Sequence, residues 1–380
     1  MKIIVTVNAA WNIWNFRRPV IKALIEDGHS VTVLAPPDQS LAMLEQMGCR
    51  IEPLQMDSKG LNPVRDFALL LRLRSAFRTH RPDAILSYTI KNNIYGALAA
   101  RTLGIPFIPN VTGLGTAFLS GGALRHISER LYRAAFNSLT TVFFENSDDR
   151  DLFVSRQMLR FDQAYVVPGT GIDLKHFAKA DYPSADAAPV FLMIGRLLRD
   201  KGVYEFADAA RRVKDVYPEA RFQLLGPAAA ENRTAIDRAT VARWEQSPGI
   251  EYLGTCEDVR GHIASANCIV LPSYREGAPR TLIEAASMAR PLIATDVPGC
   301  RSVVNDTETG YLCKPRNGES LAKACVSFLA LSRDQQAAFG MAGRRKMERE
   351  FGEERVITAY RRAISEGVNV ALAKRKRVRG

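Results

Sequence analysis

The sequence predicts an α/β protein built from two Rossmann-like domains, each with a parallel sheet. Short β-branched runs alternate with amphipathic helical segments, which is the pattern of doubly wound sheets. The alternation stops over residues 176–189 and then begins again. The chain of 380 residues also exceeds the size at which one hydrophobic core usually stops growing. Open α/β sheets bind ligands at the carboxyl ends of their strands, so we expect the site in a cleft that the two domains face.

The N-terminal domain is expected over residues 1–175. The apolar run at its start ends at Asn8 and is too short for a signal-peptide core. It is therefore interpreted as a first strand, and two further strand–helix pairs follow. The predicted strands and helices are Lys2–Val7 with Arg18–Glu26, Ser30–Ala35 with Leu41–Met47, and Asp83–Tyr88 with Asn93–Leu103.

Residues 176–189 are expected to form a linker, because prolines, alanines and polar residues replace the periodic pattern. The C-terminal domain is expected over residues 190–350. Residues 351–380 predict a helix that returns to the N-terminal domain and ends in a basic tail. The predicted strands of the second domain are Val190–Ile194, Arg221–Leu225, Ile250–Leu253, Cys268–Leu271 and Leu292–Thr295.

Composition narrows the functional classes. No apolar run reaches the about eighteen residues that a membrane span requires, so we expect a soluble protein or one bound peripherally to a membrane. The six cysteines lie far apart, without histidines at ligand spacing, and predict neither a zinc site nor a disulfide framework. The net charge of +12 indicates an anionic partner.

Two cations follow the first strand of the second domain. Gly195 and Arg196 come directly after this strand, and Lys201 precedes Gly202, where a helix is expected to begin. A helix N-terminus binds anions through its unpaired amides and its dipole. A solvated basic loop would have the same composition, so this segment alone does not define a site.

Two carboxylates follow the strand Cys268–Leu271. Glu276 lies at the expected strand-to-helix turn beside Gly277, and Glu284 lies about a turn and a half into a helix that Pro279 begins. Carboxylates accept hydrogen bonds from sugar hydroxyls. Taken singly, each glutamate could instead complement the helix dipole or lie on a solvated face.

At these residues the sequence resembles the family-four retaining glycosyltransferases of the GT-B fold. Glu276 to Glu284 matches their Glu-x7-Glu motif, and Gly195-Arg196 with Lys201-Gly202 matches their diphosphate-binding pair. The resemblance extends over nearly the whole chain. Five more segments look like bacterial members that extend lipid-linked oligosaccharides, of the α-1,3-N-acetylgalactosaminyltransferase type: Asn12–Arg17, Tyr88–Lys91, Val111–Gly115, Asn146–Arg150 and Thr295–Arg301.

The resemblance implies roles for individual residues. Arg196 and Lys201 would hold the nucleotide diphosphate, Glu276 the donor sugar and Glu284 the ribose; Glu276, Arg196 and Lys201 are thus the expected catalytic residues. The expected donor-binding residues are Gly195, Arg196, Lys201, Glu276, Gly277, Ala278, Thr281, Leu282 and Glu284. The acceptor-side candidates are Asn12, Asn15, Lys91 and Thr112.

The resemblance also implies retention of anomeric configuration, without a metal ion or other cofactor. Cations and helix amides would stabilise the charge that develops on the leaving diphosphate. Asp149-Arg150-Asp151 has the letters of a metal-binding Asp-x-Asp motif, but its place at a helix start favours capping. A uridine diphosphate donor carrying a hexose or N-acetylhexosamine is expected, and a guanosine donor remains open.

Two segments depart from the family pattern. The first strand–helix loop reads Asn8-Ala9-Ala10-Trp11, where many relatives have Gly-Gly. Thr112-Gly113-Leu114 stands where many relatives have a histidine. The N-terminal residues that contact the donor are therefore left open.

The expected acceptor is a polyprenyl-diphosphate-linked glycan for cell-surface polysaccharide or glycoprotein assembly, at the cytoplasmic face of the inner membrane. Three features suit an anionic membrane surface: the arginine–leucine stretch Val64–His80, the segment around Phe118 and Leu119, and the tail from Lys374 to Arg379. Ordinary packing would explain each of them singly. The oligomeric state is left open.

Other functions remain open. A glycosyltransferase with a soluble acceptor and a nucleotide-sugar epimerase would share the architecture and the donor motifs. A basic nucleic-acid-binding module would explain the charge, but the sequence lacks aromatic–basic RNA motifs and the spacing of a helix-turn-helix or zinc finger.

Overall fold

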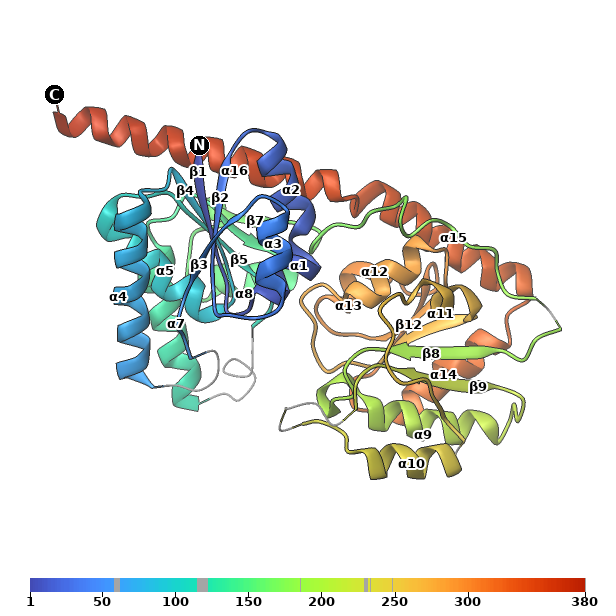
Figure 1. Cartoon of the computed structure of the whole chain (residues 1–380). Helices are drawn as coiled ribbons and strands as arrows, with labels where there is room; N and C mark the ends of the chain where they lie inside the picture. Colours follow the sequence, from blue (N-terminus) through green and yellow to red (C-terminus); the bar gives the residue numbers. More distant parts are fainter. Residues whose placement is uncertain are drawn as a thin grey trace. The chain divides into compact units, whose positions relative to one another are not determined.

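The computed structural model describes residues 1–57, 62–114, 122–184, 186–228, 232, 234–247 and 249–379, apart from the side chains of residues 123, 375 and 377–379. The chain divides into two compact units (Figure 1). Unit 1 comprises Met1–Thr170 and Glu353–Gly380, and unit 2 comprises Gly171–Gly352. The last helix therefore belongs with the N-terminal unit.

Unit 1 contains a seven-stranded sheet in the order β3-β2-β1-β4-β5-β6-β7. Each strand pairs with its neighbours in parallel. The strand order reverses between β1 and β4, which is the switch point where such sheets bind ligands. The strands are β1 (Lys2–Thr6), β2 (Ser30–Ala35), β3 (Arg50–Pro53), β4 (Ala84–Tyr88), β5 (Phe107–Val111), β6 (Val142–Phe144) and β7 (Ala164–Val166).

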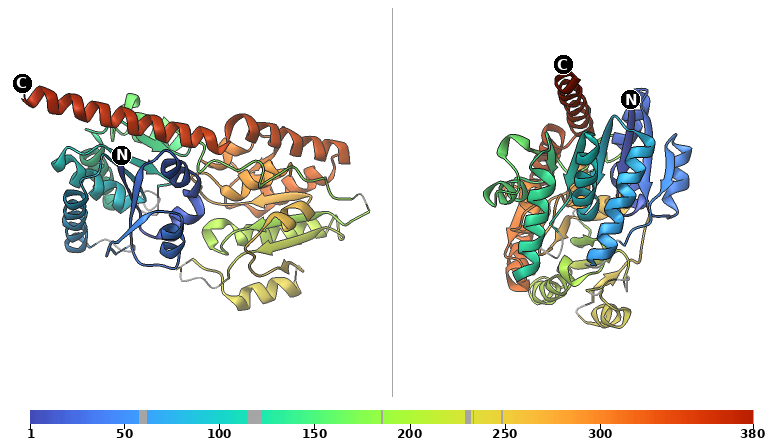
Figure 2. Two further views of the ribbon diagram at one scale, coloured as in Figure 1. Left: turned by 45° about the horizontal axis from the view of Figure 1, so that its top comes forward. Right: turned by 90° about the vertical axis from the view of Figure 1, so that its left-hand side faces the viewer.

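Helices cover both faces of this sheet. Ile3 and Val5 of β1 pack with α1, α2, α3 and α16, whereas Ile4 packs with α4, α5, α7 and α8. Helices α4, α5 and α7 lie side by side (Figure 2). The helices are α1 (Ala10–Phe16), α2 (Arg18–Glu26), α3 (Ser40–Gln46), α4 (Pro63–His80), α5 (Ile90–Leu103), α7 (Gly122–Phe136), α8 (Ser147–Ser155) and α16 (Glu353–Arg379).

Unit 2 contains a six-stranded sheet in the order β10-β9-β8-β11-β12-β13, again with parallel pairings. Its switch point lies between β8 and β11. The strands are β8 (Val190–Ile194), β9 (Arg221–Leu225), β10 (Glu251–Tyr252), β11 (Cys268–Leu271), β12 (Leu292–Thr295) and β13 (Gly310–Cys313). Two similarly ordered α/β units confirm the predicted fold class.

The strands of unit 2 are likewise covered on both faces. Phe191 and Met193 of β8 pack with α9, α10 and α14, and Leu192 and Ile194 pack with α11, α12, α13 and α15. The helices are α9 (Val203–Lys214), α10 (Arg238–Gln246), α11 (Arg260–Ser265), α12 (Arg280–Ser287), α13 (Cys300–Val303), α14 (Gly318–Leu329) and α15 (Arg333–Glu350).

The segment expected to be a linker, residues 176–189, is part of unit 2. Its described residues form no helix or strand, yet several of its carbonyl groups accept hydrogen bonds from arginines elsewhere in unit 2. Arg290, which is fully buried, donates hydrogen bonds to the carbonyls of Ala180 and Asp181. Arg290 thus fixes this irregular backbone to unit 2. The boundary between the units accordingly falls between residues 170 and 171.

Helix α16 completes the core of unit 1. It packs against α2, β4 and β5, and its Val356, Tyr360 and Ile364 are buried. The Tyr360 hydroxyl accepts a hydrogen bond from Asn110 Nδ2 at 3.0 Å. None of the helices in the described part of the chain combines the length and apolar character that a membrane span requires.

A buried ion pair lies beside α16. Arg17 Nη2 donates to Glu145 Oε1 at 2.5 Å, and the Arg17 guanidinium lies 4.6 Å from the centre of the Tyr88 ring. The two charged side chains are only 5% and 6% exposed. Burial raises the pKa of the Glu145 carboxyl, and the charge of Arg17 offsets only part of this rise. Removal of either residue would therefore leave the other as an unpaired charge in the core.

We expect Arg17→Met to reduce the free energy of unfolding by about 3–5 kcal/mol, because it leaves a buried carboxylate without its cation. Chemical denaturation of the full chain would measure the loss. Arg18→Met is the matched control, since Arg18 is exposed and its replacement should change stability by about 0.5 kcal/mol or less. Equal effects of the two variants would contradict the assigned role of the pair.

Candidate functional site

The topology of unit 2 brings the two predicted motifs together. Gly195 and Arg196 follow β8, and the segment Pro272–Gly277 follows β11. These strands are hydrogen-bonded neighbours at the switch point of the sheet. Because the strands are parallel, both loops leave from the same carboxyl edge, which is where open α/β sheets bind ligands.

Close backbone contacts fix the two loops against each other. Gly202 has a φ of +77°, and a Cβ atom at this position would overlap the carbonyl group of Pro272. The amide of Tyr274 donates to the carbonyl of Asp200 at 2.9 Å. Gly299, with a φ of +80°, similarly allows the loop after β12 to approach Gly277. Main-chain contacts thus hold the loops of the site against one another.

Lys201 and Glu276 form an ion pair across these loops. The pair is partly shielded, with side chains 25% and 12% exposed. Cys300, which is buried, lies close enough for the charge of Glu276 to add to the rise in its thiol pKa that burial causes. The lysine expected to bind phosphate and the glutamate expected to bind sugar therefore lie together as an ion pair.

Glu284 is held by a second ion pair. Arg280 Nε, one helical turn earlier on α12, donates to Glu284 Oε1 at 2.6 Å. Burial raises the pKa of the Glu284 carboxyl, while Arg280 and then His176 lower it. Arg280 thus favours the ionised carboxylate that can accept hydrogen bonds from hydroxyl groups.

The remaining predicted residues have different surroundings. Arg196 is exposed and forms no ion pair within the residues that the structure describes. Thr281 Oγ1 donates to the carbonyl of Ile194 at 3.3 Å and so ties α12 to the end of β8. Leu282 is fully buried in the core, which leaves only its main chain for a ligand. Gly195, Gly277 and Ala278 are partly exposed in the loops.

Sequence reasoning missed a polar group beside the site. The Tyr274 hydroxyl donates to Glu205 Oε1 at 2.8 Å, and the Arg316 guanidinium lies 4.6 Å from the centre of the Tyr274 ring. These residues come from α9, the loop after β11 and the loop after β13. No spacing in the sequence connects these three residues. The position of Tyr274, two residues before Glu276, did indicate that Tyr274 lies near the site.

The acceptor-side candidates lie at the carboxyl edge of the sheet of unit 1. Asn12 Nδ2 donates to Asn8 Oδ1 at 3.1 Å, and Asn15 Nδ2 donates to the carbonyl of Trp11 at 2.9 Å. Thr112 follows β5 and is partly exposed. The structure therefore places Asn12 and Asn15 on α1, beside the end of β1.

Lys91 is the second residue of α5 and lies beside the Asp66 carboxylate. Its Nζ lies 2.7 Å from Asp66 Oδ1, and the Tyr95 hydroxyl donates to Asp66 Oδ2 at 3.1 Å. Thr89, just before α5, has a φ of +73°, which is unfavourable for a β-branched residue. Such strain is typical of positions whose backbone is held for function.

The expectation that Asp149-Arg150-Asp151 lies at a helix start is confirmed. Asn146 caps α8 by accepting a hydrogen bond from the Asp149 amide at 2.8 Å, so Asp149 lies in the first turn of that helix. Phe118 and Leu119 lie outside the described residues. Among the residues that the structure describes, no group of three or more potential metal ligands is present.

Both halves of the chain match models of known families. A glycosyl transferase 4-like domain matches residues 13–170, and a domain described as glycosyl transferases group 1 matches residues 188–330. Together these matches cover most of the chain. The second contains every predicted donor-binding residue of unit 2.

Similar proteins extend the match. The chain is 28% identical over 339 residues to the Campylobacter jejuni N,N'-diacetylbacillosaminyl-diphospho-undecaprenol alpha-1,3-N-acetylgalactosaminyltransferase, covering 85% of this chain and 88% of that protein. It is 23% identical over 280 residues to the Escherichia coli UDP-Gal:alpha-D-GlcNAc-diphosphoundecaprenol alpha-1,3-galactosyltransferase, covering 70% and 72%.

Solved structures share the fold. The sucrose-phosphate synthase of Thermosynechococcus elongatus has a TM-score of 0.77 at 21% identity and covers 96% of this chain and 100% of that chain. Anabaena HepE in complex with UDP and glucose has a TM-score of 0.77 at 17% identity, covering 96% and 99%. The chain is therefore a glycosyltransferase of the GT-B fold, with a glycosyl transferase 4-like domain in its N-terminal half and a domain of the group 1 glycosyl transferases in its C-terminal half.

Proposed function

We propose that this glycosyltransferase moves a hexose or N-acetylhexosamine from a uridine diphosphate donor to a polyprenyl-diphosphate-linked glycan, with retention of anomeric configuration and without a metal ion. The observation that carries the donor part is the meeting of Lys201 and Glu276 at the switch point of unit 2. A cation for phosphate and a carboxylate for hydroxyl groups are the two functions that a nucleotide-sugar site requires.

The chemistry follows from these charges. The bond between the anomeric carbon and the diphosphate oxygen breaks, and its electron pair passes to the diphosphate. The acceptor hydroxyl oxygen forms the new glycosidic bond, and its proton is released. Arg196 and Lys201 would stabilise the negative charge that grows on the leaving group. Arrival of the diphosphate would draw Lys201 from Glu276, whose carboxylate could then accept hydrogen bonds from the sugar.

The acceptor part of the proposal draws on relatives. The names of the Campylobacter jejuni and Escherichia coli proteins both specify an undecaprenyl-diphosphate-linked sugar, and the second name specifies UDP-galactose. The HepE structure holds UDP. These names support a lipid-linked acceptor and a uridine donor for this chain.

We also propose peripheral association with an anionic membrane through unit 1. Helix α4 supports this, because Val64, Phe67 and Leu71 recur at helical spacing on its exposed side and are 79%, 62% and 47% exposed. Arg74 and Arg78 continue the same exposed side. An apolar stripe with arginines suits a lipid surface better than water.

A donor panel tests the proposed function. UDP-sugars should raise the thermal unfolding temperature, and GDP-sugars should not, because a ligand bound only to the native state stabilises it. The stabilising donor should then support transfer to a polyprenyl-diphosphate-linked glycan, and a chelator should leave the rate unchanged.

Stabilisation by GDP-sugars alone would overturn the uridine assignment. A strict metal requirement would overturn the metal-free mechanism, and epimerised sugar without acceptor would favour an epimerase.

Replacement of the charged residues of the proposed site should lower transfer without unfolding the protein. Glu276→Ala should abolish transfer, and Arg196→Ala or Lys201→Ala should lower kcat on the order of 10²-fold or more, as loss of a preorganised charge stabiliser does. Glu219→Ala, at an exposed acid of unit 2, is the control and should retain full activity. Near-normal turnover of Glu276→Ala would contradict the assigned site.

Arg280→Gln should make donor binding more sensitive to acid. Without Arg280, the already raised pKa of Glu284 rises further. As the pH falls, the variant therefore loses the ionised Glu284 carboxylate at a higher pH than the parent protein does, and with it the proposed contact to the ribose. Calorimetric donor affinities across mildly acidic to mildly alkaline pH should show the variant weakening earlier than the parent protein. Arg238→Gln, at an exposed arginine, is the control, and an unshifted profile for Arg280→Gln would disprove the role of this pair.

A further inference from the structure

Tyr274 connects the two loops that carry the donor motifs. Its main-chain amide donates to the carbonyl of Asp200 at 2.9 Å, and its hydroxyl donates to Glu205 Oε1, in the first turn of α9, at 2.8 Å. Lys201 directly follows Asp200, and Glu276 lies two residues after Tyr274. The tyrosine therefore ties the loop of the lysine and the start of α9 to the loop of the glutamate.

The contact between Tyr274 and Glu205 is a lasting one that the fold does not need for its own sake. Burial, and then the Glu205 carboxylate, raise the pKa of the tyrosine hydroxyl to about 12, so it remains a donor throughout the neutral range. Glu205 stands three residues after the N-cap Gly202, where a glutamate often caps its own helix. Its Oε2 is instead buried without a hydrogen-bond partner in the described part of the chain. Because such an oxygen lowers stability, stability alone does not explain the contact.

The connection through Tyr274 uses none of the groups that the donor is proposed to occupy. The Lys201–Glu276 ion pair joins the same two loops, but arrival of the diphosphate would draw Lys201 away. The hydroxyl and amide of Tyr274 would still hold the loops together after that exchange, because Glu205 and Asp200 take no part in it. The loop of Glu276 would thus keep its place beside α9 while the carboxylate changes partner.

We propose that Tyr274 is a positioning residue of the transfer reaction. Its hydrogen bond to Glu205 holds the loop of Glu276, so that this carboxylate meets the donor sugar when Lys201 turns to the diphosphate. The Arg316 guanidinium, 4.6 Å from the ring centre, adds a cation–π contact that restrains the ring. This role rests on the proposed function, in which Glu276 accepts hydrogen bonds from the sugar. The contribution of Tyr274 should therefore vanish when the Glu276 carboxylate is absent.

Calorimetric titration with UDP and with a UDP-sugar tests this role, because the ratio of the two dissociation constants measures what the sugar adds. Tyr274→Phe deletes only the hydroxyl and should weaken UDP-sugar binding about tenfold or more, as loss of one hydrogen bond to a charged acceptor does. UDP itself should bind as it does to the parent protein. If the donor panel selects GDP-sugars, GDP and its sugar replace this pair.

A double-mutant cycle identifies the group through which Tyr274 acts. Glu276→Ala should weaken UDP-sugar binding, and Tyr274→Phe added to it should cause no further loss. Glu205→Ala should reproduce Tyr274→Phe, whereas Glu205→Gln keeps an acceptor oxygen and should bind the sugar like the parent protein. An equal effect of Tyr274→Phe with and without the Glu276 carboxylate would exclude the positioning role.

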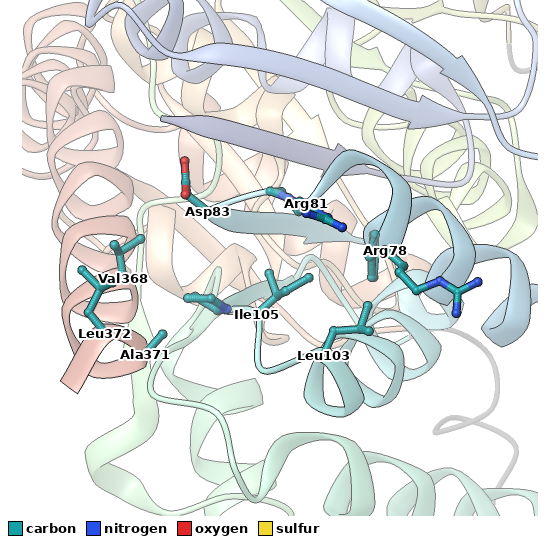
Figure 3. A pocket seen from close by; sticks show the side chains of 11 residues that line it. Arg78, Arg81, Asp83, Leu103, Ile105, Val368, Ala371 and Leu372 are labelled. Atoms are coloured by element: carbon teal, nitrogen blue, oxygen red, sulfur yellow. The ribbon is translucent and has the colours of Figure 1, made fainter. Parts of the chain in front are cut away.

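Two variants control for other effects of these changes. Tyr204→Phe removes a hydroxyl from a side chain that is 46% exposed, next to Glu205, and should leave both affinities unchanged. Ile105→Val removes one methyl group from the wall of a cavity of about 300 Å³ in unit 1, where Ile105 lies across from Val368 of α16 (Figure 3). This change should slightly lower the unfolding temperature without altering either affinity, because the donor residues belong to unit 2.

The outcomes separate this role from the proposed function. If the parent protein binds no nucleotide sugar, the proposed function fails and the role of Tyr274 fails with it. If the parent protein binds the UDP-sugar and Tyr274→Phe binds it equally well, only the role of Tyr274 fails. An unfolding temperature of Tyr274→Phe far below that of Ile105→Val, with UDP and UDP-sugar weakened alike, would make Tyr274 a residue of the fold and overturn the proposal.

Discussion

Lys201 and Glu276 are 75 residues apart in the chain and meet because β8 and β11 are adjacent at the switch point of a parallel sheet. The rest of the site depends on this adjacency. It brings two loops so close that only a glycine fits at position 202 against the carbonyl group of Pro272. Main-chain contacts therefore hold the two loops that carry the cation and the carboxylate against each other.

The two ion pairs of unit 2 have different consequences. The Lys201–Glu276 pair joins two loops, so a ligand that carries both an anion and hydroxyl groups can replace each partner with a new one. The Arg280–Glu284 pair lies within one helix and can persist beside a ligand, since a carboxylate has two oxygens that accept several hydrogen bonds. The Lys201–Glu276 pair is therefore suited to an exchange of partners, whereas in the second pair Arg280 orients the Glu284 carboxylate.

Sequence periodicity predicted the buried strands well, because strands covered on both faces are continuous apolar runs. Strands β2, β8, β9, β11 and β12 have the predicted bounds. Strand β3 was not predicted, since Arg50–Pro53 is short and none of its residues is buried. Helix α1 was also not predicted, because Ala9 at its start provides no side-chain cap.

The site itself could be predicted only in part. The motif residues follow strands whose neighbours are fixed by the general order of such sheets, so the approach of Lys201 and Glu276 was within reach of the sequence. The spacing of Arg280 and Glu284 by four residues also allowed their pairing to be expected. The contact of Tyr274 with Glu205 and Arg316 depends on loop conformations that no local pattern encodes.

The return of α16 to unit 1 has a consequence for biosynthesis. Unit 2 is one continuous segment, Gly171–Gly352, and can fold as soon as that segment has left the ribosome. Unit 1 begins first but lacks Val356, Tyr360 and Ile364 of its core until the helix from Glu353 onward has been made. The order of folding during translation is therefore inverted, and the N-terminal unit must keep an apolar face uncovered while the C-terminal unit forms.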